Sequence, residues 1–317
     1  MTAVQEMPAL RDRLGPAFVA QRTALEQYQP PREFGVWMMI FHPRYLPILR
    51  WMMWFTLKCL GLYGRGVRNA HTLQTQENRV AIRGLPAAFA GFRILHLSDL
   101  HLDIQPTITD ALIRHLQGLQ YDCCVITGDF REGLWTAPDQ ALAETARLMP
   151  HLREPVYVVP GNHDSLEMAE ALERMGMRVL INEHIILNRG GASICLAGLD
   201  DTHYYRTHDL TAALRGVPED MPVVMLAHSG EVYRDAAARG VDLLLCGHTH
   251  GGQICLPGGF ALMHHVEHPR AMSRGAWRFG ALQGYTSSGV GASILPVRFF
   301  CPPQVVIHIL EKSEDSS

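Results

Sequence analysis

The segment FRILHLSDLHLD, residues 92–103, decides the fold. It opens with a mainly apolar run typical of a buried strand, and Asp99 and His101 follow that run at once. Four later segments repeat this pattern of an apolar run with a polar end, over residues 121–129, 155–164, 222–228 and 241–250. Because the carboxyl ends of parallel strands meet at one edge of an open α/β sheet, we expect the polar ends to form one site.

The polar ends supply carboxylates, one amide and several imidazoles. The residues are Asp99, His101, Asp129, Asn162, His228, His248 and His250. Such ligands suit Mn²⁺, Fe or Zn²⁺, and a structural zinc finger is not expected because the set contains no thiolate. Two ions about 3.5–4 Å apart can hold the attacking and the leaving oxygen of a phosphoryl displacement. A bridging carboxylate is then needed, and Asp129, central in the order, is the candidate.

The ordered motifs Asp-x-His, Gly-Asp, Gly-Asn-His-Asp, His and Gly-His-x-His resemble those of the calcineurin-like metallophosphoesterase superfamily. The similarity covers roughly residues 92–310. Within it, LSDLH at 97–101, GLDD at 198–201 and GHTHGGQ at 247–253 resemble a bacterial branch of membrane-associated phosphodiesterases. This branch includes the UDP-2,3-diacylglucosamine pyrophosphatases of lipid A biosynthesis. Each motif alone is weak evidence, whereas the ordered set is specific.

The resemblance implies a role for each site residue. One metal ion would be held by Asp99, His101, Asp129 and His250, and the other by Asp129, Asn162, His228 and His248. His163 would stand beside the metals and protonate or hydrogen-bond the leaving oxygen. Many relatives orient this histidine with an aspartate three residues after the bridging one, and here Glu132 occupies that position.

The resemblance also implies the fold and the reaction. The fold would be of the α/β class, a four-layer α/β/β/α sandwich of two mixed sheets. The sequence pattern predicts helices over residues 107–117, 137–148 and 165–175 and a closing strand over 305–310. The protein would be a metal-dependent phosphoric ester or pyrophosphate hydrolase, in which a hydroxide bridging two divalent ions attacks phosphorus. Manganese is the first expectation, with iron and zinc as alternatives.

Composition agrees with one sizeable catalytic domain, expected over residues 81–317, after an extension over residues 1–80. The chain has 317 residues and a formal net charge of −3, so no global field attracts nucleic acid, and no nucleic-acid partner is expected. Its seven cysteines show no disulfide spacing, which favours a reduced compartment. The sequence does not determine the oligomeric state.

The N-terminal extension has a composition of its own. Residues 34–76 contain no acidic residue and five basic ones, and residues 34–63 form a dense apolar block. Charged residues and prolines interrupt this block, so we expect neither a membrane span nor a signal peptide. If residues 47–65 form one helix, Arg50, Lys58 and Arg65 share a side, and a wide apolar face covers much of the rest. Such a helix fits a membrane interface. The alternative is a helix packed on the catalytic domain or on a second copy of the chain.

The substrate predicted from these features is a phosphorylated, lipid-linked small molecule such as UDP-2,3-diacylglucosamine. The protein would then be cytoplasmic and peripherally associated with the inner face of the membrane. One alternative is a general phosphodiesterase or phosphatase acting on soluble nucleotides. Another is a non-catalytic scaffold of the same fold, which the complete ligand set disfavours.

Other polar residues near the motifs have ordinary interpretations. Asp200 and Asp201 follow an apolar run and are expected to form a turn. The histidines outside the motifs, namely His203, His264, His265 and His268, are interpreted as loop residues that line the substrate cleft.

Overall fold

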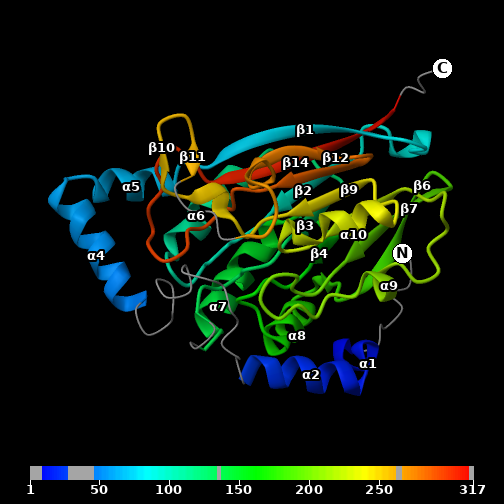
Figure 1. Cartoon of the computed structure of the whole chain (residues 1–317), viewed down its shortest axis with the longest axis horizontal. Coiled ribbons are helices and arrows are strands. Elements are labelled where there is room, and N and C mark those ends of the chain that lie inside the picture. The colour runs from blue at the N-terminus through cyan, green and yellow to red at the C-terminus, as the bar shows by residue number, and fades with distance from the viewer. Residues whose placement is uncertain (1–8, 28–45, 134–136, 262–265, 314–317) are drawn as a thin grey trace.

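The computed structural model describes residues 9–27, 46–133, 137–261 and 266–313. Two six-stranded sheets lie face to face, with helices on the outside (Figure 1). This arrangement confirms the predicted α/β/β/α sandwich of two mixed sheets. The strands and helices predicted around the motifs are present, with ends within two residues of those expected.

The first sheet carries the first three polar ends. Its strands, in spatial order, are β1 (Gln74–Ile82), β14 (Gln304–Lys312), β2 (Arg93–Leu97), β3 (Cys123–Ile126), β4 (Val156–Val158) and β5 (Arg178–Val179). Only the pair of β14 and β2 is antiparallel among the described pairs of this sheet. The parallel strands β2, β3 and β4 therefore end at the same edge.

The second sheet carries the remaining polar ends. Its strands, in order, are β12 (Gly275–Phe279), β13 (Leu282–Thr286), β9 (Leu243–Cys246), β8 (Val223–Leu226), β7 (Ala192–Gly198) and β6 (Glu183–Arg189). The outer pairs are antiparallel, while β8 and β9 run parallel and end together. A separate short hairpin joins β10 (Cys255–Leu256) to β11 (Phe260–Ala261).

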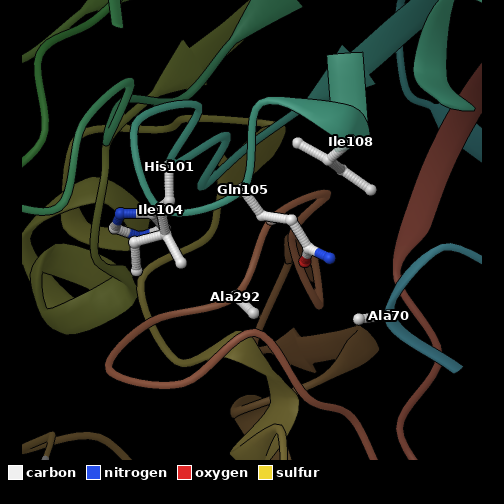
Figure 2. Close-up of a pocket in the computed structure, with 7 residues that line it drawn as sticks. Ala70, His101, Ile104, Gln105, Ile108 and Ala292 are labelled. Carbon is white, nitrogen blue, oxygen red and sulfur yellow. The ribbon is translucent and has the colours of Figure 1, made fainter. Parts of the chain in front are cut away.

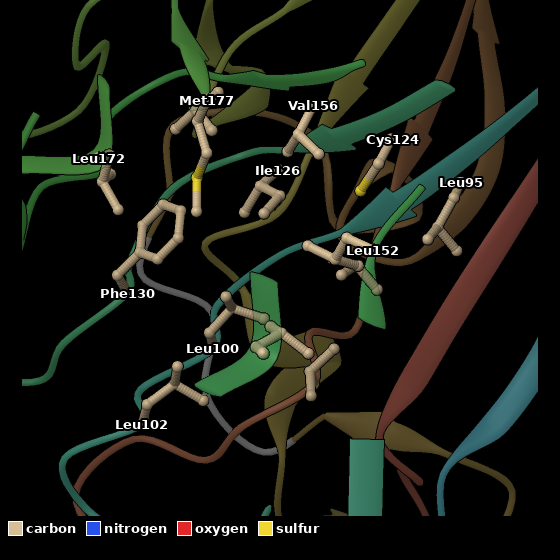
Figure 3. Close-up of a cluster of buried hydrophobic side chains, with 14 of the residues drawn as sticks. Leu95, Leu100, Leu102, Cys124, Ile126, Phe130, Leu152, Val156, Leu172 and Met177 are labelled. Atoms are coloured by element: carbon tan, nitrogen blue, oxygen red, sulfur yellow. The ribbon is translucent and has the colours of Figure 1, made fainter. Parts of the chain in front are cut away.

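Alternation of side chains along the strands divides the interior into layers. Ile94 and Val125 of the first sheet pack with Leu226 and Leu245 of the second, which fills the space between the sheets. The opposite side chains of the first sheet pack under α6 (Thr107–Leu116), α7 (Asp139–Leu148) and α8 (Leu166–Arg174), as Figure 3 shows for part of that cluster. Helices α9 (Leu210–Ala213) and α10 (Tyr233–Ala238) cover the second sheet. Burial on both faces explains why the inner strands are continuous apolar runs.

The N-terminal third contributes α1 (Leu10–Leu14), α2 (Pro16–Gln27), α4 (Leu46–Cys59) and α5 (Tyr63–Ala70). Residues 47–65, considered above as one helix, are divided between α4 and α5, because α4 ends in a glycine cap. Gly61 has φ +68°, and the amides of Gly61 and Leu62 donate to the carbonyls of Lys58 and Leu57. This is the pattern of a Schellman motif, which stops a helix.

Two further features bear on the predicted extension. The domain boundary expected at residue 80 falls inside β1, which pairs with β14 over its whole length. Among the described residues, no helix combines the length and the apolar character needed to cross a membrane. The apolar segment over residues 34–45 lies outside the described residues.

Candidate metal centre

The polar ends of the strands meet at one edge of the sandwich. Two groups of side chains could each hold a metal ion: Asp99, His101 and His250, and Asp129, His228 and His248. In each group the ligand atoms lie within 4.8 Å of one another. The first sheet supplies the two aspartates and His101, while the second supplies the other three histidines. We call the surface formed by these six residues and Asn162 the metal edge.

Asp129 lies between the two groups. Its Oδ2 is 3.1 Å from Nε2 of His228 and 3.8 Å from Nε2 of His101. Within the groups, Nε2 of His101 is 3.1 Å from Nε2 of His250, and Nε2 of His228 is 3.1 Å from Nδ1 of His248. Imidazole nitrogens and carboxylate oxygens that converge within such distances form a set of donors that a divalent cation can bind.

Hydrogen bonds from the far side of the rings orient two of these histidines. Nδ1 of His228 donates to the carbonyl of Thr127 at 2.6 Å, and Nδ1 of His101 donates to the carbonyl of Arg131 at 3.0 Å. Because Nδ1 carries the proton in both rings, Nε2 is the atom available to a metal.

The backbone at the metal edge adopts conformations that L-residues rarely use. Positive φ angles occur at Asp99, His101, Asp129, His248 and His250. Each such residue costs energy, of order 1–3 kcal/mol, and is retained only where surrounding structure imposes it. Residues in this conformation cluster at functional sites, so their concentration here is evidence for a site.

Two glycines allow the loops to approach this closely. A Cβ atom at Gly161 would lie 2.1 Å from Oδ1 of Asp129, and one at Gly247 would lie 2.4 Å from Oδ2 of Asp99. Both distances are shorter than any tolerable contact. The glycines of the Gly-Asn-His-Asp and Gly-His-x-His motifs are therefore required by packing against the carboxylates.

Asn162 has an unsatisfied polar atom. Its Oδ1 is buried and has no hydrogen-bond partner among the described residues. The residues on either side of it contact Asp129: Gly161 as described above, and His163 through an amide that donates to Oδ1 of Asp129 at 3.0 Å. A buried carbonyl oxygen without a partner costs about 1–3 kcal/mol, and a cation beside Asp129 would remove that cost.

His163 lies beside the two groups of candidate ligands and is partly accessible to solvent. Its side chain is 24% exposed, whereas that of Asp129 is 2% exposed. Nε2 of His163 lies 3.9 Å from Oδ2 of Asp129, and its ring meets the ring of His101 edge-on with centroids 5.5 Å apart. The ring therefore lies beside the candidate ligands and also faces solvent.

Glu132 does not take the position expected of it. We predicted that it would orient His163, but the structure places its Oε2 3.0 Å from Nδ1 of His101. Its Oε1 accepts hydrogen bonds from the Ser293 hydroxyl at 2.9 Å and from the Ile294 amide at 2.7 Å. These bonds hold the longer glutamate side chain toward His101, so Glu132 supports a candidate ligand instead.

Asp164 organises the edge and was not assigned a role from the sequence. Its Oδ2 accepts from the amides of Asp129 at 2.8 Å and Gly161 at 2.9 Å, and its Oδ1 accepts from the Phe130 amide at 3.1 Å. This carboxylate joins the loop after β3 to the loop after β4. Its position at the end of the Gly-Asn-His-Asp motif was the sequence feature from which this role could have been predicted.

Electrostatics at the metal edge favour a bound cation. Burial raises the pKa of Asp99, and the nearby charge of Asp129 acts in the same direction. Burial would lower the pKa of His228, but Asp129 outweighs this effect and raises that pKa to about 10. Two buried carboxylates therefore depend on positive charge nearby, and a divalent ion would supply it while displacing the imidazole proton.

The remaining predicted residues lie around this centre. Asp201 accepts from the amides of His203 and Tyr204, as expected of a turn residue. The His203 ring contacts that of His248, with centroids 4.3 Å apart, and its Nδ1 lies 3.0 Å from Glu231. Of the other three loop histidines, His268 is buried. His264 and His265 lie outside the described residues.

Asp200, which we expected to act as a turn residue, forms a buried ion pair with α2. Its Oδ2 accepts from Nε of Arg22 at 3.0 Å. Arg22 is 1% exposed, also pairs with Glu26 at 2.8 Å, and stacks 3.5 Å above the Tyr205 ring. Burial alone would lower the pKa of Arg22, but Asp200, Glu26 and other neighbouring groups together outweigh burial, so the pKa is raised and the charge is kept. Through this ion pair, α2 is attached to the catalytic domain.

Comparison with known proteins agrees with this geometry. Residues 92–252, half of the chain, match the family model described as calcineurin-like phosphoesterase. The chain therefore belongs to the calcineurin-like phosphoesterase family. It is a metal-dependent phosphoester hydrolase, and its cofactors are divalent metal ions.

Three relatives illustrate the extent of the similarity. The chain is 32% identical over 229 residues to a transmembrane protein with metallophosphoesterase domain from Bos taurus, covering 66% of this chain and 50% of that protein. It is 27% identical over 255 residues to the uncharacterized metallophosphoesterase YkuE of Bacillus subtilis, covering 77% and 87%. For YkoQ of the same organism the identity is 29% over 253 residues, covering 76% and 92%. The chain thus spans about half the length of the bovine relative.

Proposed function

We propose that the protein hydrolyses a phosphodiester or pyrophosphate bond at a pair of divalent ions bound to the metal edge. The ligands of the first ion would be Asp99, His101, Asp129 and His250, and those of the second Asp129, Asn162, His228 and His248. The observation that carries this assignment is the position of Oδ2 of Asp129, within 4 Å of a histidine from each group. The partnerless Oδ1 of Asn162 supports it further.

Different residues of the chain would have different roles in this hydrolysis. When bound, a pair of divalent ions lowers the pKa of water and neutralises charge on the phosphate oxygens. Asp129 lies between the two groups of ligands, and the hydrogen bond from Nδ1 of His101 to the Arg131 carbonyl keeps Nε2 of that ring available. The His163 ring is partly exposed to solvent, and its Nε2 lies 3.9 Å from Oδ2 of Asp129. It is placed to donate a proton to the leaving oxygen.

The substrate we propose is lipid-linked, of the type of UDP-2,3-diacylglucosamine. The motifs at residues 97–101 and 247–253 support this assignment, as does the exposure of Trp51 and Phe55 on α4. A helix with exposed apolar side chains fits an enzyme whose substrate lies in a membrane. Residues 46–70 would accordingly hold the protein at the inner face of the membrane, and manganese is the metal we propose first.

Activity measurements on purified full-length protein test the proposal. With Mn²⁺ present, diacylated UDP-glucosamine should be hydrolysed faster than the deacylated compound, and bis(p-nitrophenyl) phosphate should be hydrolysed as a generic diester. Equal rates on the two nucleotide sugars would favour an enzyme for soluble nucleotides. Absence of turnover on all three substrates, with each of Mn²⁺, Fe²⁺ and Zn²⁺, would contradict hydrolysis at this site.

A further inference from the structure

Large apolar side chains are exposed on three segments of the chain: α4, the β10–β11 hairpin and the loop before β14. Trp51 on α4 is 59% exposed, Phe260 on β11 is 57% exposed, and Phe300 in the loop before β14 is 50% exposed. We call the full set the docking face: Ile48, Trp51, Met52, Phe55, Leu256, Phe260 and Phe300. Exposed apolar clusters of this kind mark surfaces that contact a partner or a membrane.

Helix α5 joins α4 to the loop before β14 and, through that loop, to the β10–β11 hairpin. The Gly66 carbonyl accepts from the Arg298 amide at 3.0 Å, and the Asn69 side chain donates to the Arg298 carbonyl at 2.9 Å. The next residue, Phe299, accepts from the Cys255 amide of β10 at 2.9 Å. Figure 1 shows α4, α5 and the β10–β11 hairpin together at one end of the molecule. The segments of the docking face are therefore joined through α5 and lie at the same end of the molecule.

The charged residues of α4 and α5 that the structure describes are all basic. The described residues of α4 and α5 include no Asp or Glu, and they carry Arg50, Lys58, Arg65 and Arg68. On the hairpin side, the Arg270 guanidinium lies 5.2 Å from the Phe260 ring centroid. Basic side chains beside exposed aromatic rings match the boundary between acyl chains and anionic headgroups. An anionic lipid surface is therefore the occupant that this charge pattern fits.

The docking face is also linked to the metal edge. The hairpin begins a few residues after His250, and Nε2 of Gln253 donates to the Ser293 carbonyl at 2.8 Å. Ser293 in turn donates to Glu132, which contacts His101. At the other side, Ala70 of α5 and His101 line the same small hollow, shown in Figure 2. A membrane at the docking face would thus lie next to the elements that hold the candidate ligands.

We propose that the protein binds an anionic lipid surface through two contacts at once, α4 on one side and the β10–β11 hairpin with Phe300 on the other. The two contacts would fix the orientation of the molecule and present the metal edge to phosphate groups at the membrane surface. The assignment of those phosphates as substrate rests on the proposed function, whereas lipid binding itself does not.

Sedimentation of the full-length protein with vesicles tests the second contact. The vesicles contain phosphatidylglycerol and phosphatidylcholine, with phosphatidylcholine alone as the comparison. The test variant combines Phe260→Asp and Phe300→Asp. The matched control is Ile186→Asp, because Ile186 is an exposed apolar residue on β6, outside the docking face. Circular dichroism and thermal unfolding report whether each variant is folded, and hydrolysis of bis(p-nitrophenyl) phosphate in solution is measured separately.

We expect wild type and Ile186→Asp to bind the anionic vesicles equally and the double variant to bind at least about tenfold more weakly, since two large apolar groups are lost from the contact. All three should hydrolyse the soluble diester equally. Unchanged binding of the double variant would overturn the second contact, and absence of wild-type binding would overturn membrane docking. A dimer that the double variant dissociates would assign the face to a second copy instead. Failure of diester hydrolysis with intact vesicle binding would contradict only the proposed function.

Discussion

Asp99, His101 and His228 are polar side chains with almost no exposed surface, whereas Trp51, Phe260 and Phe300 are large apolar side chains with half or more of their surface exposed. At the metal edge, hydrogen bonds between loops of both sheets compensate for the burial of polar side chains. One example is the bond from the His248 amide to Asp99 at 3.0 Å. At the docking face, no comparable network is required. We therefore propose that catalysis and membrane binding use separate surfaces, which mutations would affect independently.

Asp129→Asn should have the largest effect and should be confined to the metal edge. The change removes the carboxylate charge between the two groups, so we expect a loss of turnover of at least about 10³-fold, beyond the 10–100-fold typical of residues that only orient ligands. Elemental analysis should find fewer than two metal ions per chain. Binding to anionic vesicles should be unchanged. A variant that still holds two ions would show that Asp129 is not the bridge.

His163→Ala should separate proton transfer from metal binding. We expect both ions to be retained and the rate to fall by about 10²–10⁴-fold, the range for loss of a general acid. The loss should be smaller for p-nitrophenolate, a leaving group that needs no proton, than for an alkoxide. Equal losses for both leaving groups would assign His163 to phosphate binding or to structure.

Glu132→Gln is the matched comparison for His163→Ala. Because Glu132 contacts His101, the change should weaken metal affinity by about 10–100-fold without any dependence on the leaving group. A leaving-group effect in Glu132→Gln would restore the role that the sequence suggested.

Arg22→Met should destabilise the fold without touching the docking face. The change leaves Asp200 buried without its partner, and breaking a buried ion pair costs about 3–5 kcal/mol. Urea unfolding should show this loss, and adding Asp200→Asn should recover part of it. Trp51→Ser on α4, an exposed position, should change the free energy of unfolding by less than about 0.5 kcal/mol. A large effect of Trp51→Ser would show that α4 packs on protein.

Acid should destabilise the protein through a buried histidine pair in the first sheet. Nδ1 of His96 lies 3.1 Å from Nε2 of His308, and burial lowers the pKa of His96 to about 3 and that of His308 well below its usual value. The unfolded chain binds these protons near pH 6.5, whereas the folded protein does not. Stability contributed by each neutral ring is therefore complete above pH 6.5 and is lost as the pH falls below it, by at most about 1.4 kcal/mol per pH unit.

Urea unfolding of wild type and His308→Gln between pH 7 and pH 5 checks this expectation. The variant has one fewer buried histidine, and glutamine can still hydrogen-bond with His96 and Asn78, the two partners of His308. Its stability should fall less steeply with acid. Parallel curves would mean that His308 does not contribute to the acid sensitivity.

The inner strands could be predicted because burial on both faces requires continuous apolar runs, as in residues 92–97. β1 was not predicted because its sequence, QTQENRVAI, is mostly polar and exposed, and the strand is held by pairing with β14 across the whole domain. The ion pair of Arg22 with Asp200 joins residues 178 positions apart, a distance at which periodicity carries no information. By contrast, the break at Gly61 had a local signal, a glycine after a basic last turn.

The candidate ligands could be named from the sequence because each follows a strand, whereas the supporting contacts could not. The position of Glu132 depends on the loop that carries Ser293 and Ile294. That loop lies about 160 residues further along the chain. Motif spacing identified the position of Glu132 but not the direction of its side chain.

Metal titration of the chelated wild-type protein tests most directly whether two ions act together. Hydrolysis of bis(p-nitrophenyl) phosphate is followed while Mn²⁺ is added to a known concentration of metal-free chain, with Asp129→Asn titrated in parallel. We predict no turnover without metal and full activity only at two equivalents per wild-type chain. Full activity at one equivalent, or activity that persists after chelation, would contradict a dinuclear centre.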